Sequence, residues 1–204
     1  MNRNRKNDPV CMADRLDFLA GILAMNGGFL QRTGLAGGKL GIAIFFYHYA
    51  QYTGKQNYDE FAGSLIDDLS DQINFSAPLD FENGLTGIGW GISYLIRKGF
   101  IEGDIDEILE EIDLAISGRL NDFLQSEQIN KEKVSGYNYY RQARNNSNHW
   151  DGSEIFSFIN PPACDDLHLT IPYLINHDNY GLFYGIAGKA FTILNSLTLK
   201  KQSK

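Results

Sequence analysis

The sequence has few cysteines and prolines, and it lacks any long uncharged apolar run. Two cysteines in 204 residues, Cys11 and Cys164, do not make a disulfide framework. Five prolines leave room for long helices. No apolar run is long enough for a membrane span, and no apolar segment of a signal peptide follows the basic residues near the start. We therefore expect a protein of the reducing cytoplasm.

Positive charge is also scarce. The formal net charge is -7 and no long basic run occurs, so we expect neither nucleic acid nor membrane as a partner. The content of 43% hydrophobic and 21% charged residues is typical of a globular protein, and 204 residues suffice for one sizeable core. The prediction is a single domain over residues 1–204, with a polar leader at residues 1–9.

Glycine, by contrast, recurs in a regular pattern. Glycine-rich segments begin at Gly34, Gly84, Gly136 and Gly181, which are 50, 52 and 45 residues apart. All but the degenerate segment at Gly136 continue into apolar stretches without proline. Glycine costs about 1 kcal/mol relative to alanine inside a helix, so clusters indicate tight turns or close backbone approach. A period of this length is typical of a repeat protein.

Amphipathic segments alternate with the glycine segments. Apolar residues recur at helical spacing in residues 10–25, 57–73 and 104–123, and a shorter candidate helix spans residues 164–175. Asn57 with Glu60, and Asp104 with Glu107, have the spacing of capping boxes. Each unit is then an amphipathic outer helix, a glycine turn and an inner helix that is apolar on all sides. Such inner helices need neighbours on every side, which favours an all-α fold: an α/α toroid or an open partial toroid of about four helical hairpins.

Three of these glycine segments resemble the lanthionine synthetase C-like family. The residues are Gly-Leu-x-Gly-Gly-x-x-Gly at 34–41, Gly-Leu-x-Gly-Ile-Gly-Trp-Gly at 84–91 and Gly-Leu-x-x-Gly-x-Ala-Gly at 181–188. The resemblance implies an α/α toroid of seven hairpins. It also implies zinc-dependent addition of cysteine thiols to dehydrated serine or threonine in a precursor peptide, as part of peptide modification and maturation.

The family's zinc ligands have no match in this sequence. The resemblance implies two cysteines and a histidine, from a Trp-Cys-x-Gly and a Cys-His-Gly element, and neither element occurs here. Thr86 stands where the family's Gly-x-x-His-Gly pattern has histidine. Because a thiol needs activation to attack at neutral pH, we expect a peptide-binding protein without zinc and without cyclase activity.

Aromatic residues on or beside the inner helices are candidates to line a central cavity for a peptide. They are Tyr47, His48, Trp90, Tyr94 and Tyr184. The alternative is that they belong to the core, as most such aromatics do.

A long irregular loop is expected at residues 145–163, and such loops are often functional. Its candidates are His149, Trp150, Asp151 and Glu154. Cys164 and His168 lie just beyond it at a helical spacing that would suit a metal, although two ligands at this spacing often arise by chance.

Two further functions remain open. Acidic residues in and after this loop, such as Asp151 and Glu154, are the carboxylates that a carbohydrate-active enzyme on an α/α toroid would use. With four hairpins, a toroid would also keep an open edge. A protein partner or a second copy of the chain could cover that edge in a non-catalytic interaction module.

Overall fold

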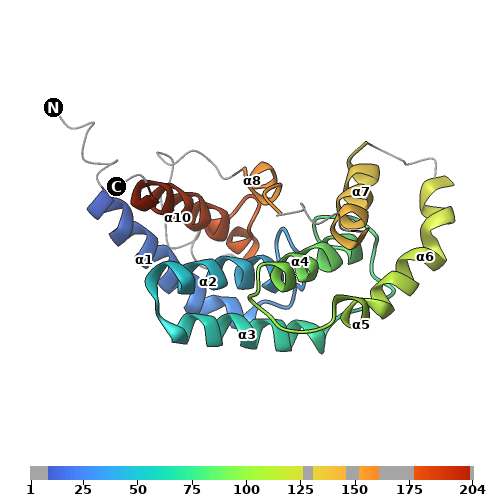
Figure 1. Ribbon diagram of the computed structural model, residues 1–204, viewed down its shortest axis with the longest axis horizontal. Coiled ribbons are helices and arrows are strands. Elements are labelled where there is room, and N and C mark those ends of the chain that lie inside the picture. The colour runs from blue at the N-terminus through green and yellow to red at the C-terminus, as the bar shows by residue number, and fades with distance from the viewer. Residues whose placement is uncertain (1–8, 126–130, 146–151, 161–176, 203–204) are drawn as a thin grey trace.

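The computed structural model describes residues 9–125, 131–145, 152–160 and 177–202, and all regular elements in these ranges are helical. The predicted all-α class is confirmed, and the helices form an open arc compatible with a partial toroid (Figure 1). The long helices are α1 (Pro9–Asn26), α2 (Lys39–Thr53), α3 (Gln56–Ser70), α4 (Leu85–Arg97), α6 (Glu110–Gln125), α7 (Lys131–Asn145) and α10 (Ile186–Gln202). The short ones are η1 (Gly27–Phe29), α5 (Ile105–Ile108), α8 (Ile155–Phe158) and η3 (His177–Tyr180). No helix in these ranges combines the length and the apolarity that crossing a membrane requires.

Four helices form an inner layer, in the spatial order α10, α2, α4, α7. Helices α2 and α4 are buried along nearly their whole length, which confirms that apolarity on all sides predicts burial on all sides. The last of the four in sequence, α10, packs beside the first, α2, and so α7 and α10 stand at the two ends of the row.

The outer helices pack differently from the predicted unit. Each was expected to pair with the inner helix that follows it, but α3 packs mainly on α2, the helix before it. The ring contact between Phe46 and Phe61, with centroids 4.9 Å apart, belongs to this interface. Helix α1 packs on α10 (Figure 1). One hairpin is therefore assembled from the two ends of the described chain.

Three equivalent glycine turns start the inner helices. The residues directly before α2, α4 and α10 are Gly38, Gly84 and Gly185, respectively. The alignment therefore differs from the predicted one, because Gly34 and Gly181 lie four residues ahead of the equivalent positions. The helix begins after the last glycine of each turn, so the first glycine of a cluster does not indicate the equivalent position.

The turns are joined to one another by backbone hydrogen bonds. The amide of Phe183 donates to the carbonyl of Ala36 (3.3 Å), and the amide of Ala36 donates to the carbonyl of Glu82 (2.6 Å). These three residues occupy the same place in their turns. The amide of Asn160, after α8, extends the series by donating to the carbonyl of Phe183 (2.9 Å). The segment after α8 thus occupies the place that another glycine turn would take.

The third residue of each of these inner helices is also a glycine. It allows the first turn of the helix to pack directly against the backbone of the glycine turn before it. A Cβ atom at Gly41, Gly87 or Gly188 would lie 2.3, 1.8 or 2.1 Å from the carbonyl oxygen six residues earlier. Those distances are far inside van der Waals contact, so no other residue fits without a shift of the backbone. The repeated Gly-x-x-Gly spacing is therefore a packing requirement.

Other local predictions had mixed outcomes. Asp104 caps α5 as expected, because its side chain accepts from the amide of Asp106 (2.8 Å), but the helix breaks at Leu109 before α6 begins. The box predicted at Asn57 does not form, since α3 starts at Gln56 after an N-cap without a side-chain hydrogen bond. Gly136 lies inside α7 rather than in a turn. The candidate helix at residues 164–175 lies outside the described residues.

Candidate functional site

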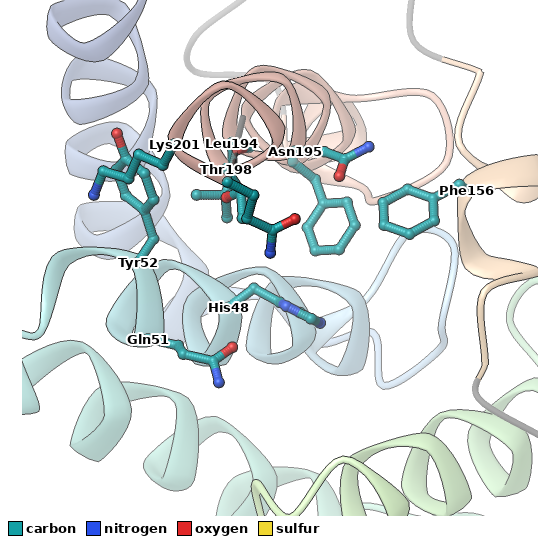
Figure 2. A pocket seen from close by; sticks show the side chains of 10 residues that line it. His48, Gln51, Tyr52, Phe156, Leu194, Asn195, Thr198 and Lys201 are labelled. Carbon is teal, nitrogen blue, oxygen red and sulfur yellow. Dashed lines mark hydrogen bonds between the residues drawn. The ribbon is translucent and has the colours of Figure 1, made fainter. Parts of the chain in front are cut away.

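A pocket of about 500 Å³ lies between the C-terminal halves of α2 and α10 (Figure 2). This is within the range of about 300–1,000 Å³ typical of ligand sites. Helix α2 contributes His48, Gln51 and Tyr52, which share one face because they are three and four residues apart. Helix α10 contributes a matching face, and α8 contributes Phe156.

The α10 face is apolar near the middle of the helix and polar towards its end. Phe191 and Leu194 come first, followed by Asn195, Thr198 and Lys201. The two helices run in the same direction from neighbouring turns, so Lys201 meets Tyr52 at the end of α2, with its ammonium nitrogen 4.0 Å from the ring centroid. The pocket therefore has an apolar end and a cationic end.

His48 forms part of the pocket wall and is held from behind. Its Nε2 atom lies 2.6 Å from the hydroxyl of Tyr94, and its ring meets those of Phe100 and Phe191 edge-on. Burial lowers the pKa of His48 to about 4, and the nearby charge of Lys98 lowers it further in the same direction. The imidazole is thus neutral at physiological pH, and can donate or accept one hydrogen bond through Nδ1.

The predicted cavity residues fall into three places. His48, Tyr94 and Trp90 form one row, since Tyr94 stacks on Trp90 with ring centroids 5.4 Å apart. Of these three, His48 lines the α2–α10 pocket. Tyr47, on another face of α2, stacks on Phe100, and the pKa of Tyr47 is raised to about 12 by burial and then by Asp59 and Asp67. Tyr184 is 56% exposed and donates to Glu82 (2.9 Å).

The space beside Trp90 is filled by α8. The ring of Phe158 contacts those of Phe81, Trp90, Tyr139 and Phe183, at centroid distances of 5.0, 5.6, 4.9 and 5.6 Å. Trp90 is fully buried. A single helical turn from the segment expected to be irregular therefore packs into the centre of the arc.

Of the loop candidates, Glu154 is the one that the structure describes. It stands at the N-cap of α8, is half-buried, and its carbonyl accepts from the hydroxyl of Ser157 (2.7 Å). His149, Trp150, Asp151, Cys164 and His168 lie outside the described residues.

The described residues do not fit the family's zinc chemistry. Within the described ranges, no three histidine, cysteine, aspartate or glutamate side chains are placed to hold one metal ion. Cys11, the one cysteine in those ranges, is exposed on α1. No step of a reaction is therefore assigned to zinc.

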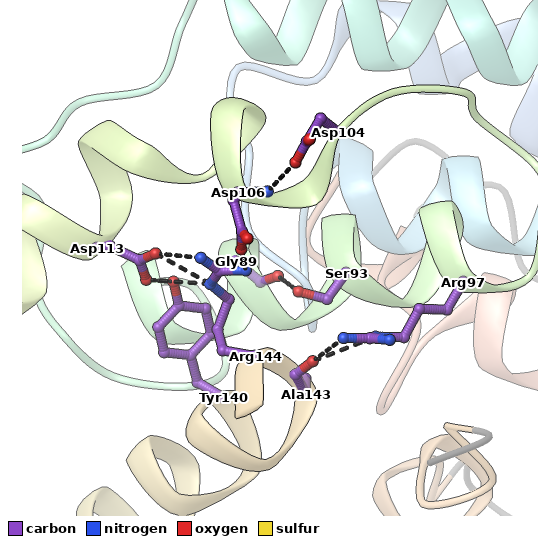
Figure 3. Close-up of polar contacts among 9 residues, drawn as sticks. All are labelled: Gly89, Ser93, Arg97, Asp104, Asp106, Asp113, Tyr140, Ala143 and Arg144. Carbon is purple, nitrogen blue, oxygen red and sulfur yellow. Dashed lines mark hydrogen bonds and ion pairs between the residues drawn. The ribbon is translucent and has the colours of Figure 1, made fainter. Parts of the chain in front are cut away.

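A polar cluster that the sequence analysis did not predict connects α7 to its neighbours α4, α5 and α6 (Figure 3). Asp113 of α6 accepts from Tyr140 and pairs with Arg144 of α7 at 2.6 Å, while Arg144 also reaches Asp106 at 2.8 Å. The hydrogen bond to Asp113 raises the pKa of Arg144. Arg97 of α4 donates to the carbonyl of Ala143 from the other side of α7. This cluster positions α7 between α4 and α6.

The α10 half of the pocket was missed as well. Phe191, Leu194 and Thr198 have the spacing of an ordinary core stripe, so nothing in the sequence marks them as pocket residues.

A comparison with protein-family models gives a match over more than half of the chain. The family model described as lanthionine synthetase C-like protein matches residues 31–150, a stretch that contains α2, α3, α4, α6 and α7. No curated protein and no solved structure matches.

Proposed function

Because the chain belongs to the lanthionine synthetase C-like family, we propose that it binds a precursor peptide in peptide maturation, and does so without zinc-dependent cyclase activity. The family match over residues 31–150 is the main observation in support of peptide binding. The proposed lack of zinc chemistry rests on the sequence, which has neither the family's Trp-Cys-x-Gly element nor its Cys-His-Gly element. An α2–α10 pocket of ligand size supports binding.

The binding test uses a labelled precursor peptide. Genes adjoining the one for this chain supply the candidate, a cysteine-containing peptide, and fluorescence anisotropy follows its titration with the purified protein. We expect saturable binding that an unlabelled copy of the peptide reverses. If neither this peptide nor its dehydrated form binds, the proposed function is wrong.

The cyclase test follows the thiol. Addition of a thiol to a dehydrated residue leaves the mass of the peptide unchanged, so ring formation is detected as loss of a cysteine that iodoacetamide can alkylate. We expect the thiol to disappear no faster with the protein than without it. Elemental analysis runs in parallel, and a stoichiometric, tightly held zinc would contradict the zinc-free part of the proposal.

An interaction module is the second candidate, and the outer face of α1 favours it. Phe18, Met25 and Phe29 are 53%, 72% and 72% exposed along α1 and η1. Large exposed apolar side chains gathered on one face often mark a protein contact. Light scattering that finds a monomer at all concentrations, with no partner bound, would count against this candidate.

The carbohydrate-active alternative depends on Glu154 and on Asp151, which lies outside the described residues. A glycan panel tests it directly. Hydrolysis that is lost in Glu154→Gln would replace peptide binding with this function.

A further inference from the structure

We propose that the α2–α10 pocket binds the C-terminal end of a peptide, with the terminal carboxylate at Lys201 and an apolar side chain about four residues earlier against Phe156 and Phe191. This inference rests on the proposed peptide binding and adds the part of the peptide that is recognised.

The charge of the pocket selects an anionic group. Among the described residues that line it, Lys201 is the one charged side chain and none is a carboxylate, although the chain as a whole has a formal net charge of -7. The ammonium lies over the ring of Tyr52 at 4.0 Å, a contact through the ring face that leaves N–H groups for a second partner. A carboxylate is therefore attracted to this end of the pocket.

The other end of the pocket selects an apolar side chain. Phe156 and Phe191 have ring centroids 5.6 Å apart, and Phe156 remains 46% exposed. In Figure 2 the ring of Phe156 lies at the end of the pocket opposite Lys201, and Phe191 contacts that ring. A side chain inserted there would cover the exposed part of Phe156, which water otherwise surrounds.

Between the two ends, the lining suits a peptide backbone. Gln51 and Asn195 carry carboxamides, each of which can donate and accept as a peptide group does. His48 offers Nδ1 of a neutral ring, because Nε2 is engaged by Tyr94. A neutral, mixed donor and acceptor surface does not repel either half of a peptide bond.

The length of the pocket sets the spacing in the ligand. Phe191 and Lys201 are ten residues apart along α10, which at ~1.5 Å per residue is about 15 Å. An extended chain covers that distance in about four to five residues at ~3.3 Å each. A pocket of about 500 Å³ has room for a short chain end, and a chain that stops at Lys201 needs no exit.

The experiment compares three pentapeptides by nuclear magnetic resonance titration of the labelled full-length chain. The first is acetyl-Phe-Ser-Gly-Ser-Gly with a free carboxylate, the second is the same peptide with a C-terminal amide, and the third is the amide with aspartate in place of the second serine. We expect the free carboxylate to bind about five-fold more tightly than either amide, the ratio that one partly exposed charge pair of about 1 kcal/mol gives.

Variants assign that preference to the pocket. Lys201→Gln should abolish the difference between carboxylate and amide, and Lys201→Arg should restore it. Lys200→Gln is the matched control, because Lys200 points to Met12 instead, with 3.7 Å between its nitrogen and the methionine sulfur. Phe156→Ser should weaken all three peptides equally.

Each other outcome overturns a stated part. Equal binding of carboxylate and amide, or equal effects of Lys200→Gln and Lys201→Gln, refutes recognition at Lys201. Tight binding of the aspartate peptide shows that an acidic side chain is the ligand instead of the C-terminus. If no pentapeptide binds but the precursor peptide does, unaffected by Lys201→Gln, this inference fails and the proposed function stands. If nothing binds, the proposed function fails too.

Discussion

Replacing Gly87 with alanine tests the packing requirement of the glycine turns. The new Cβ would lie 1.8 Å from the carbonyl oxygen of Phe81, whereas ordinary contact begins at 3.4 Å. The carbonyl would have to retreat by about 1.6 Å, but the next residue, Glu82, is tied to Ala36 by a backbone hydrogen bond of 2.6 Å. Alanine gains about 1 kcal/mol in helix propensity, and overpacking against fixed backbone costs about 3 kcal/mol or more. The net expected loss is at least about 2 kcal/mol.

Gly21→Ala is the matched control, since a Cβ at Gly21 of α1 would meet no atom within 4 Å. This change should stabilise the fold by about 0.5–1 kcal/mol through helix propensity. Urea unfolding followed by circular dichroism gives both free energies. Thermal midpoints should shift by about 2–4 °C per kcal/mol for a chain of this size, in opposite directions for the two variants. If Gly87→Ala is as stable as Gly21→Ala, the turn does not constrain the helix as described.

Three further predictions concern the pocket, the polar cluster and helix α8. Burial lowers the pKa of His48 to about 4 in the folded chain, from 6.5 in the unfolded chain. Between these pH values the unfolded chain binds an extra proton, so the free energy of unfolding falls by about 3 kcal/mol as the pH drops from about 6.5 towards 4. The urea midpoint of His48→Gln should therefore depend less on pH than that of the unaltered chain. Asp113→Asn should lower the free energy of urea unfolding by about 1–3 kcal/mol, because a tyrosine and an arginine of α7 both bind that carboxylate. Asp106→Asn should lower it by under about 1 kcal/mol, because the side chain of Asp106 is 82% exposed. Equal losses would show that Asp113 is not the centre of the cluster. Phe158→Ala should lower the stability measured by thermal unfolding by about 3 kcal/mol, because the ring of Phe158 contacts four other rings. Phe156→Ala should lower it by less than half of that, because Phe156 is 46% exposed.

Several of the helices could be predicted from sequence, because they follow local patterns. Apolar residues all round α2 and α4 predicted their burial, and Asp104 predicted a helix start that the structure confirms. These features depend on residues within one or two turns of each other. Three of the four glycine segments were recognised as turns for the same reason, whereas the one at Gly136 lies inside α7.

Pairings between distant segments could not be predicted in this way. Nothing local to α1 indicates that its partner is α10, and nothing in residues 145–163 indicates that Phe158 reaches the ring of Trp90. The pocket follows from the α2–α10 contact, so its α10 lining was as hidden as that contact. His48 was predicted as a cavity residue from its place on an inner helix, but its partner Tyr94 and its neutral state depend on the packing of three elements.

The pairing of α10 with α1 and α2 also has a consequence for synthesis on the ribosome. Helix α2 is synthesised more than a hundred residues before residues 186–202, which cover one of its buried flanks. Contacts between such distant segments slow folding, because a long loop must close before they form. Until α10 arrives, the apolar flank of α2 and the inner side of α1 remain exposed in the nascent chain. Partly made chains of this protein are therefore expected to need chaperones more than the finished fold does.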